Sequence, residues 1–180
     1  APKEPPSIYR GFNSPSKVKL ARECFKKHEP YFRAAESHFK VPSVIVAAVL
    51  FVETSCGKVT GRSQILHRLS RLASVGDPEN LRRNYEKQRK VDKTVTFEQV
   101  LERANYLENL FYPEIDALLK ISEQQRISVF EIKGSAAGAF GISQFLPSSY
   151  LKFGYDGNRD NVISPYSMSD AIWSAANYLA

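Results

Sequence analysis

Glu53 is the residue in this sequence best placed for acid–base chemistry. It follows the nine apolar residues of 44–52 and precedes the small-residue stretch from Thr54 to Gly57. Desolvation by an apolar core and the negative end of a helix dipole both disfavour a charged carboxylate. A carboxyl group held in its protonated form can donate a proton near neutral pH. The spacing alone also fits a glutamate that only reaches solvent at a helix end.

The loop 156–170 has the oxygen spacing of a calcium-binding loop. Its candidate ligands stand at positions one, three, five and seven, followed by a closing acid: Asp156, Asn158, Asp160, Val162 through its carbonyl, and Asp170. The pattern departs from an EF-hand, because position six is Asn161, where glycine is usual, and position twelve is Ser167, where glutamate is usual. The loop therefore predicts either a weak structural Ca²⁺ site or a plain turn rich in Asp and Asn.

Helical periodicity predicts the elements that must position these groups. We expect an extended arm over residues 1–14, an amphipathic helix from Pro15, a fully buried helix over 44–52, and a last helix from Ser169 or Asp170. Between them the pattern predicts three further helices, at Ser63–Leu72, at Thr96–Glu108 with a capping box, and at Pro113–Glu123. Strand-like alternation is missing, so the expected fold is mostly α with little or no β structure.

Size and charge limit the classes of function. With 180 residues and 43% hydrophobic content, the chain can bury one good core, which predicts a single domain over 15–180. The net charge of +6 favours anionic partners, but the cations are scattered and no nucleic-acid module is indicated. No apolar run approaches the roughly 20 residues that a transmembrane helix needs.

Cys24 and Cys56 fit no metal-ligand spacing, so they are either two free thiols or one disulfide. The polar, proline-rich start has no signal-peptide pattern, which suits a processed exported protein or a trimmed chain. The segment 134–150 is of a different kind: it holds three glycines among small residues, which indicates close backbone spacing or access for a ligand.

Several motifs together resemble the catalytic domain of the lytic murein transglycosylase B family. The resemblance runs in order from Phe39 to the last residue, through Val52-Glu-Thr54 with Gly57, GSAAGAFGISQFLPSSY at 134–150, and the final Asp170-Ala-Ile and Ala176-Asn-Tyr-Leu179. The long glycine-rich motif is the specific part. The sequence departs from the family in being longer between Glu53 and Ser135, where Asn80–Thr96 is highly charged, and in ending at Ala180, where the resembled proteins usually continue.

The resemblance implies a goose-lysozyme-like α domain that cleaves the β-1,4 bond between N-acetylmuramic acid (MurNAc) and N-acetylglucosamine (GlcNAc) of peptidoglycan, leaving a 1,6-anhydro end. Glu53 would act as the single acid and base, and no cofactor is needed for this chemistry. By the same match, Ser135 and Gln144 contact substrate, and Phe145 and Tyr178 line the groove. From the residues alone, Ser135 could equally cap a helix, and the two aromatic rings could equally fill the core.

The resemblance also implies a monomer that acts on peptidoglycan strands in the periplasm or cell envelope, or as a secreted protein. Some members of the family carry a lengthened calcium loop like that of 156–170. Two other functions stay open from the sequence: a hydrolytic muramidase, which admits water to the same site, and a non-catalytic peptidoglycan-binding module.

Overall fold

The computed structural model describes residues 14–180, so the predicted arm 1–14 lies outside the described residues apart from Ser14. Over this range the fold is mostly α, as the sequence predicts. The helices are α1 Pro15–Lys27, α2 Glu29–Phe39, α3 Ser43–Thr54, α4 Ile65–Ala73, α5 Pro78–Val91, α6 Phe97–Gln125, α7 Pro147–Phe153 and α8 Met168–Leu179. The strands are β1 Ser63–Gln64 and β2 Lys133–Gly134.

The described chain divides into two compact units. Unit 1 contains the chain up to Thr60 and two later segments, Gly141–Gln144 and Lys152–Ala180. Unit 2 contains Gly61–Phe140 and Phe145–Leu151. The glycine-rich motif is therefore shared between the units, since its middle belongs to unit 1 and its two ends to unit 2. The assignment of 15–180 to one catalytic domain stays a prediction.

Unit 1 is built around α2, α3 and α8, which pack on one another. Their buried side chains form an apolar cluster that includes Phe32, Leu50 and Ile172. The prediction that helix 44–52 is fully buried is wrong, because Val44 is 62% and Val52 is 48% exposed. A helix that is apolar on every side gives no sequence signal of which side the rest of the protein covers.

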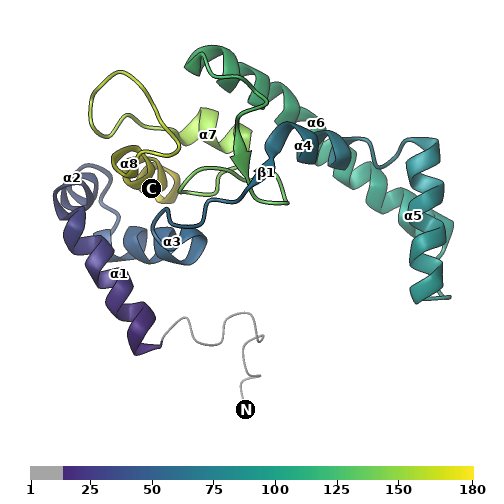
Figure 1. Ribbon diagram of the computed structural model, residues 1–180, viewed down its shortest axis with the longest axis horizontal. Coiled ribbons are helices and arrows are strands. Elements are labelled where there is room, and N and C mark those ends of the chain that lie inside the picture. The colour runs from purple at the N-terminus through teal and green to yellow at the C-terminus, as the bar shows by residue number, and fades with distance from the viewer. Residues whose placement is uncertain (1–13) are drawn as a thin grey trace. The chain divides into compact units, whose positions relative to one another are not determined.

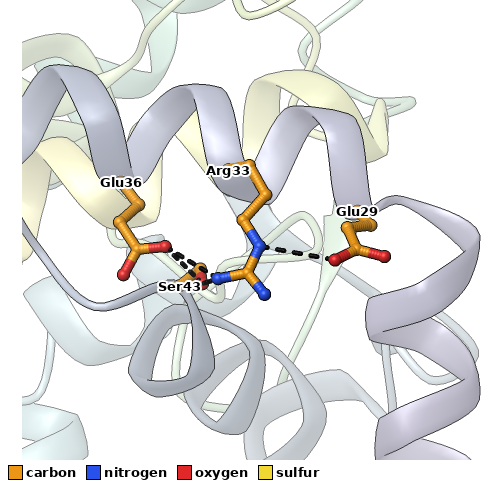
Figure 2. Close-up of polar contacts among 4 residues, drawn as sticks. All are labelled: Glu29, Arg33, Glu36 and Ser43. Carbon is orange, nitrogen blue, oxygen red and sulfur yellow. Dashed lines mark hydrogen bonds and ion pairs between the residues drawn. The ribbon is translucent and has the colours of Figure 1, made fainter.

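Polar groups of α2 hold the start of α3 (Figure 2). The Ser43 hydroxyl donates to Glu36 at 2.8 Å, and Arg33 donates to Glu36 at 3.1 Å and to Glu29 at 3.4 Å. The Ser43 hydroxyl, then the Ser43 backbone N–H, and then Arg33 lower the pKa of Glu36 by hydrogen bonding to its charged form. A carboxylate beside the first turn of α3 also suits the positive end of the helix dipole. The helix that carries Glu53 is thus fixed at its start.

Unit 2 is organised by α6, the long helix on which α4 and α5 pack (Figure 1). Thr96 forms the predicted capping box with Gln99 at its start. The sequence predicts two helices in this region, but α6 continues through Pro113 to Gln125. Proline removes one backbone donor and strains the turn before it. The intact turns on both sides and the packing on α4 keep the helix continuous.

The remaining elements are short. In β1 and β2, Ser63 pairs with Gly134 and Gln64 with Lys133 in an antiparallel register. Because β1 takes Ser63 and Gln64, α4 begins two residues later than the sequence predicts. Helices α2, α5 and α7 are not among the predicted elements. None of the helices in residues 14–180 is both long enough and apolar enough to cross a membrane.

Candidate active site

Glu53 lies in the last turn of α3, as predicted, and its side chain is exposed to solvent. Within unit 1, as far as the structure describes it, no ion pair or side-chain hydrogen bond engages this carboxylate. The sequence predicts desolvation of Glu53 by the protein core, and that prediction is wrong, because the side of α3 that carries Val46 and Leu50 is the covered one. An exposed carboxylate is accessible to a substrate, and a bound substrate would shield it from water.

A sharp turn follows Glu53. Ser55, Cys56 and Gly57 have consecutive positive φ angles of 50°, 58° and 80°. The N–H groups of Ser55 and Cys56 donate to carbonyls of the preceding turn at 2.8 and 3.1 Å, and these bonds end the helix. Only one of the three residues is a glycine, so the surroundings must hold the other two in a conformation that side chains disfavour.

The Cys24–Cys56 disulfide ties this turn to α1, with the two Cα atoms 6.4 Å apart. The sequence leaves open whether the two cysteines are free thiols or a disulfide. In the structure they form the disulfide, and neither is free. The turn after Glu53 is therefore covalently attached to the first helix of unit 1.

Thr54 connects the same turn to the middle of the glycine-rich motif. Its side chain is 1% exposed, and Oγ1 lies 2.9 Å from the Ile142 carbonyl oxygen and 2.9 Å from the Gly57 nitrogen. Gly57 fits here for two reasons: its φ is positive, and a Cβ atom would approach the Ile142 side chain to 3.2 Å. Glu53 therefore precedes a small network in which turn and motif hold each other.

Gln144 belongs to this network. Its Nε2 donates to the Thr60 carbonyl at 3.1 Å and to the Gly141 carbonyl at 2.8 Å. The residue has a φ of 50°, so it too lies in the left-handed region. The amide nitrogen fastens the backbone, which leaves the amide oxygen as the polar atom that could meet a substrate.

The other predicted site residues are distributed over both units. Tyr178 lies on α8 in unit 1, half exposed, with its ring edge-on to Phe153 at a centroid distance of 5.0 Å. Ser135 and Phe145 lie in unit 2. The structure thus brings Glu53, Gln144 and Tyr178 into one unit and assigns the other two to the second.

Ser135 begins a tight turn in unit 2. Its backbone N–H donates to the Ala139 carbonyl at 2.7 Å, and its Oγ accepts the Ala139 N–H at 3.1 Å. Gly138 occupies the turn with a φ of 91°, and a Cβ atom there would come within 2.5 Å of the Leu69 side chain. The Ser135 hydroxyl therefore closes a local turn and caps no helix, and its contact with substrate stays a prediction.

Glu114 is a site-supporting residue that the sequence reasoning missed. It is 5% exposed on α6, and its carboxylate accepts the Ser148 backbone N–H at 2.8 Å and the Ser148 hydroxyl at 2.5 Å. These bonds cap the first turn of α7, which begins within the last residues of the glycine-rich motif. An acid on the covered side of a helix was the available signal, because buried carboxylates need partners.

The loop 156–170 is fastened by its own carboxylates. Asp156 accepts N–H groups from Arg159, Asp160 and Asn161 at 2.6 to 3.2 Å. Asp170, which is buried, accepts those of two other loop residues, Gly157 at 3.1 Å and Ser164 at 2.8 Å. No group of three or more His, Cys, Asp or Glu side chains in residues 14–180 is placed to hold a metal ion. The residue types suit calcium, and the bound cation stays a prediction.

A separate groove of about 370 Å³ runs between α1 and α3 in unit 1. Its walls include the exposed Val44 and Val52 and three cations, Lys17, Arg22 and Lys26, but not Glu53.

Comparison with known proteins identifies the family. Residues 2–180 match the family described as the transglycosylase SLT domain. The chain belongs to this family. This SLT-domain chain is similar to the membrane-bound lytic murein transglycosylase B of Escherichia coli, with 29% identity over 167 residues, which are 93% of the chain and 38% of that relative. The resemblance found in the motifs is confirmed.

Solved structures agree. The E. coli lytic transglycosylase Slt35, in complex with calcium, is 29% identical and superimposes with a TM-score of 0.71 over 93% of this chain and 45% of that one. SltB1, a soluble lytic transglycosylase from Pseudomonas aeruginosa, is 26% identical with a TM-score of 0.71 over 93% of this chain and 47% of its own. These matches confirm the lysozyme-like helical fold. The SLT-domain chain spans less than half the length of each relative.

Proposed function

We propose that this SLT-domain chain is a lytic transglycosylase that cleaves the β-1,4 bond between MurNAc and GlcNAc in peptidoglycan and leaves 1,6-anhydro-MurNAc ends. The observation that carries the proposal is the position of Glu53. Its carboxylate is exposed at the end of a helix that is fixed at its start by Glu36 and at its end by Thr54 and the disulfide. The named relatives are lytic transglycosylases, which supports the same assignment.

Glu53 would act first as an acid. A glycan strand lying over the exposed carboxyl group removes water from it and so favours the uncharged, proton-donating form. The proton passes to the glycosidic oxygen, the bond from that oxygen to C1 of MurNAc breaks, and an oxocarbenium-like centre forms. The Glu53 carboxylate then takes the proton of the C6 hydroxyl as O6 attacks C1. The new O6–C1 bond closes the anhydro ring, Glu53 regains its proton, and no water is consumed.

A single carboxylate is consistent with the chemistry of the described residues. Most glycosidases that use water or a covalent intermediate have a second carboxylate, roughly 5 to 9.5 Å from the first. The acids of unit 1 near the matched motifs, Asp156 and Asp170, use their oxygens to hold their own loop. The internal C6 hydroxyl of the substrate makes a second carboxylate unnecessary.

The remaining site residues would bind and orient the strand. The Gln144 amide oxygen and the Ser135 hydroxyl suit the acetamido and hydroxyl groups of the sugars, and Phe145 and Tyr178 suit their apolar faces. Hydrogen-bond donors and acceptors that are already held in place stabilise developing charge without reorganising. No cofactor is needed for this reaction.

The setting that fits this activity is the bacterial cell envelope. The Cys24–Cys56 disulfide suits an oxidising compartment such as the periplasm. The net positive charge suits anionic wall polymers. Peptidoglycan strands are thus the proposed partner.

Digestion of purified sacculi tests substrate, reaction and residue together. Mass spectrometry should find anhydro-MurNAc ends with the wild-type protein. The Glu53→Gln variant should release them about 10² to 10⁴ times more slowly, the range that general acid–base catalysis contributes. Glu102→Gln, which removes the same charge from an exposed position on α6, is the matched control and should digest as wild type does.

The two alternatives give different results in the same assay. Reducing ends without anhydro ends would identify a hydrolytic muramidase. Sacculus binding without release of any product by the wild type would identify a binding module. Glu53→Gln digesting at the wild-type rate would remove Glu53 as the acid.

A further inference from the structure

Thr54 stands out as a buried polar side chain directly beside the exposed Glu53. Its hydroxyl has one proton and lies 2.9 Å from the Ile142 carbonyl and 3.3 Å from the Leu50 carbonyl of its own helix. The shorter contact is the better hydrogen bond, so we place the proton toward Ile142. The oxygen also accepts the Gly57 N–H at 2.9 Å. One buried hydroxyl thus satisfies a donor and an acceptor that are 85 residues apart in the sequence.

The path from Glu53 to Gln144 through this hydroxyl is short. Thr54 follows Glu53 directly, and Ile142 precedes Gln144 by two residues. Consecutive Cα atoms are about 3.8 Å apart, so each half of the path is only one or two residues long. Ile142 is itself held from its other side, since its N–H donates to the Pro165 carbonyl at 2.8 Å. Because both connections are short, loss of the hydroxyl bond should shift Glu53 relative to Gln144.

We propose that Thr54 is a positioning residue: its hydroxyl sets the location of Glu53 relative to Gln144 by joining the end of α3 to the 141–144 segment. This inference rests on the proposed roles of Glu53 and Gln144. Thr54 itself is buried and does not touch the glycan strand. It acts on the rate because a misplacement of about 1 Å between a catalytic group and its substrate can cost about 10²-fold.

The contacts distinguish positioning from simple stability. Gln144 also reaches the far end of the turn, at Thr60, so the segment and the turn are joined at two points. The disulfide at Cys56 keeps the turn attached to α1 whichever residue occupies position 54. Loss of the hydroxyl should therefore loosen the alignment of Glu53 and Gln144 while the fold persists.

Two substitutions separate the hydroxyl from the methyl group. Thr54→Val keeps the shape and removes the hydroxyl, whereas Thr54→Ser keeps the hydroxyl and removes the methyl. Val46→Ala is the control for stability, because Val46 is a fully buried residue of the same helix with no polar role. Release of anhydro-MurNAc ends is measured for all proteins well below their melting temperatures, with kcat and KM determined separately.

We expect Thr54→Val to lower kcat by about 10- to 100-fold with KM changed less than about threefold, and Thr54→Ser to stay within about threefold of wild type. Val46→Ala should lower the melting temperature and leave kcat unchanged. Amide exchange gives a readout without activity: Gly57 N–H should lose protection in Thr54→Val and keep it in Thr54→Ser.

Each outcome bears on one proposal. A Thr54→Val protein with wild-type kcat would overturn the positioning role, as would an equal loss of kcat in Val46→Ala. Unchanged Gly57 exchange in Thr54→Val would overturn it as well. If the wild type releases no anhydro ends, the proposed function fails and Thr54 positions no catalyst, whereas an active wild type beside an active Thr54→Val rejects Thr54 alone.

Discussion

The turn after Glu53 and the turn after Gly134 are both short, and both contain residues in the left-handed (positive φ) region. They are held by different kinds of contact. The first is held by groups far away in the sequence, through the Thr54–Ile142 bond and the Cys24–Cys56 bridge. The second is held largely within Ser135–Ala139, by backbone and hydroxyl bonds four residues apart. A turn of the second kind can form from its own residues, whereas the first depends on the folded unit around it. The proposed acid thus lies in the last turn of a helix whose end is fixed only when the unit has folded.

Removing the disulfide should have the largest effect of the changes that test this difference. The bridge closes a loop with a sequence separation of 32, for which the chain-entropy model gives a stabilisation of about 3.7 kcal/mol. We expect the double variant Cys24→Ser, Cys56→Ser to lose about that much unfolding free energy in urea titration, and reduction of the wild type to give the same loss. An unchanged midpoint in both would show that the turn after Glu53 needs no covalent support.

Glu114 tests the other end of the glycine-rich motif, because its buried carboxylate caps the start of α7, where the motif ends. Glu114→Ala leaves the Ser148 N–H and hydroxyl without their acceptor, and we expect it to lower the unfolding free energy by about 2 to 3 kcal/mol. Glu114→Gln keeps one acceptor oxygen and should lose less than half of that. Thermal unfolding of both variants measures the difference, and equal losses would mean that the volume of the side chain matters and its hydrogen bonds do not.

A smaller effect is expected at the start of α3, where the contacts are exposed. Hydrogen bonds lower the pKa of Glu36, so this carboxylate stabilises the fold above the ordinary glutamate value of 4.5, and the contribution is lost as the pH falls through the lower folded-state pKa. Glu36→Gln should lower the melting temperature by a few degrees at pH 7. The gap between variant and wild type should close under acid conditions; a gap that stays constant down to pH 2 would contradict the assignment.

Calcium should have the smallest effect, because the carboxylates of the loop 156–170 already accept backbone N–H groups. At a tenfold excess over its dissociation constant, calcium would add about 1.4 kcal/mol by mass action. We expect millimolar calcium to raise the melting temperature of the wild type relative to chelator and to leave Asp160→Ala unmoved. Equal shifts in both proteins, or none in the wild type, would mean that these side chains serve only the turn.

The parts of the fold that the sequence predicts are those with a local cause. Pro15 at the start of α1 and the Thr96 capping box both act within a few residues, and both are present. The motifs in order also predict the family. These signals can be read from a single sequence because cause and effect lie side by side.

The parts that the sequence does not predict depend on contacts between distant segments. The exposure of Val44 and of Glu53 follows from which side of α3 is covered, and an apolar run carries no such information. Glu114 and Ser148 are 34 residues apart, and no sequence pattern near either residue predicts their contact. The roles of Ser135, Gln144, Phe145 and Tyr178 as substrate contacts stay predictions.

The continuity of α6 has a consequence for changes in the length of the chain. Each residue of an α-helix turns it by about 100° and advances it by about 1.5 Å. One residue inserted between Val100 and Phe111 would therefore rotate Glu114 away from Ser148, or force the packing on α4 and α5 to slip. The highly charged stretch at Asn80–Thr96 instead falls in α5 and the connection that leads to the Thr96 cap. Insertions and deletions there leave the register of Glu114 untouched, so this is the part of unit 2 that can vary in length without disturbing the glycine-rich motif.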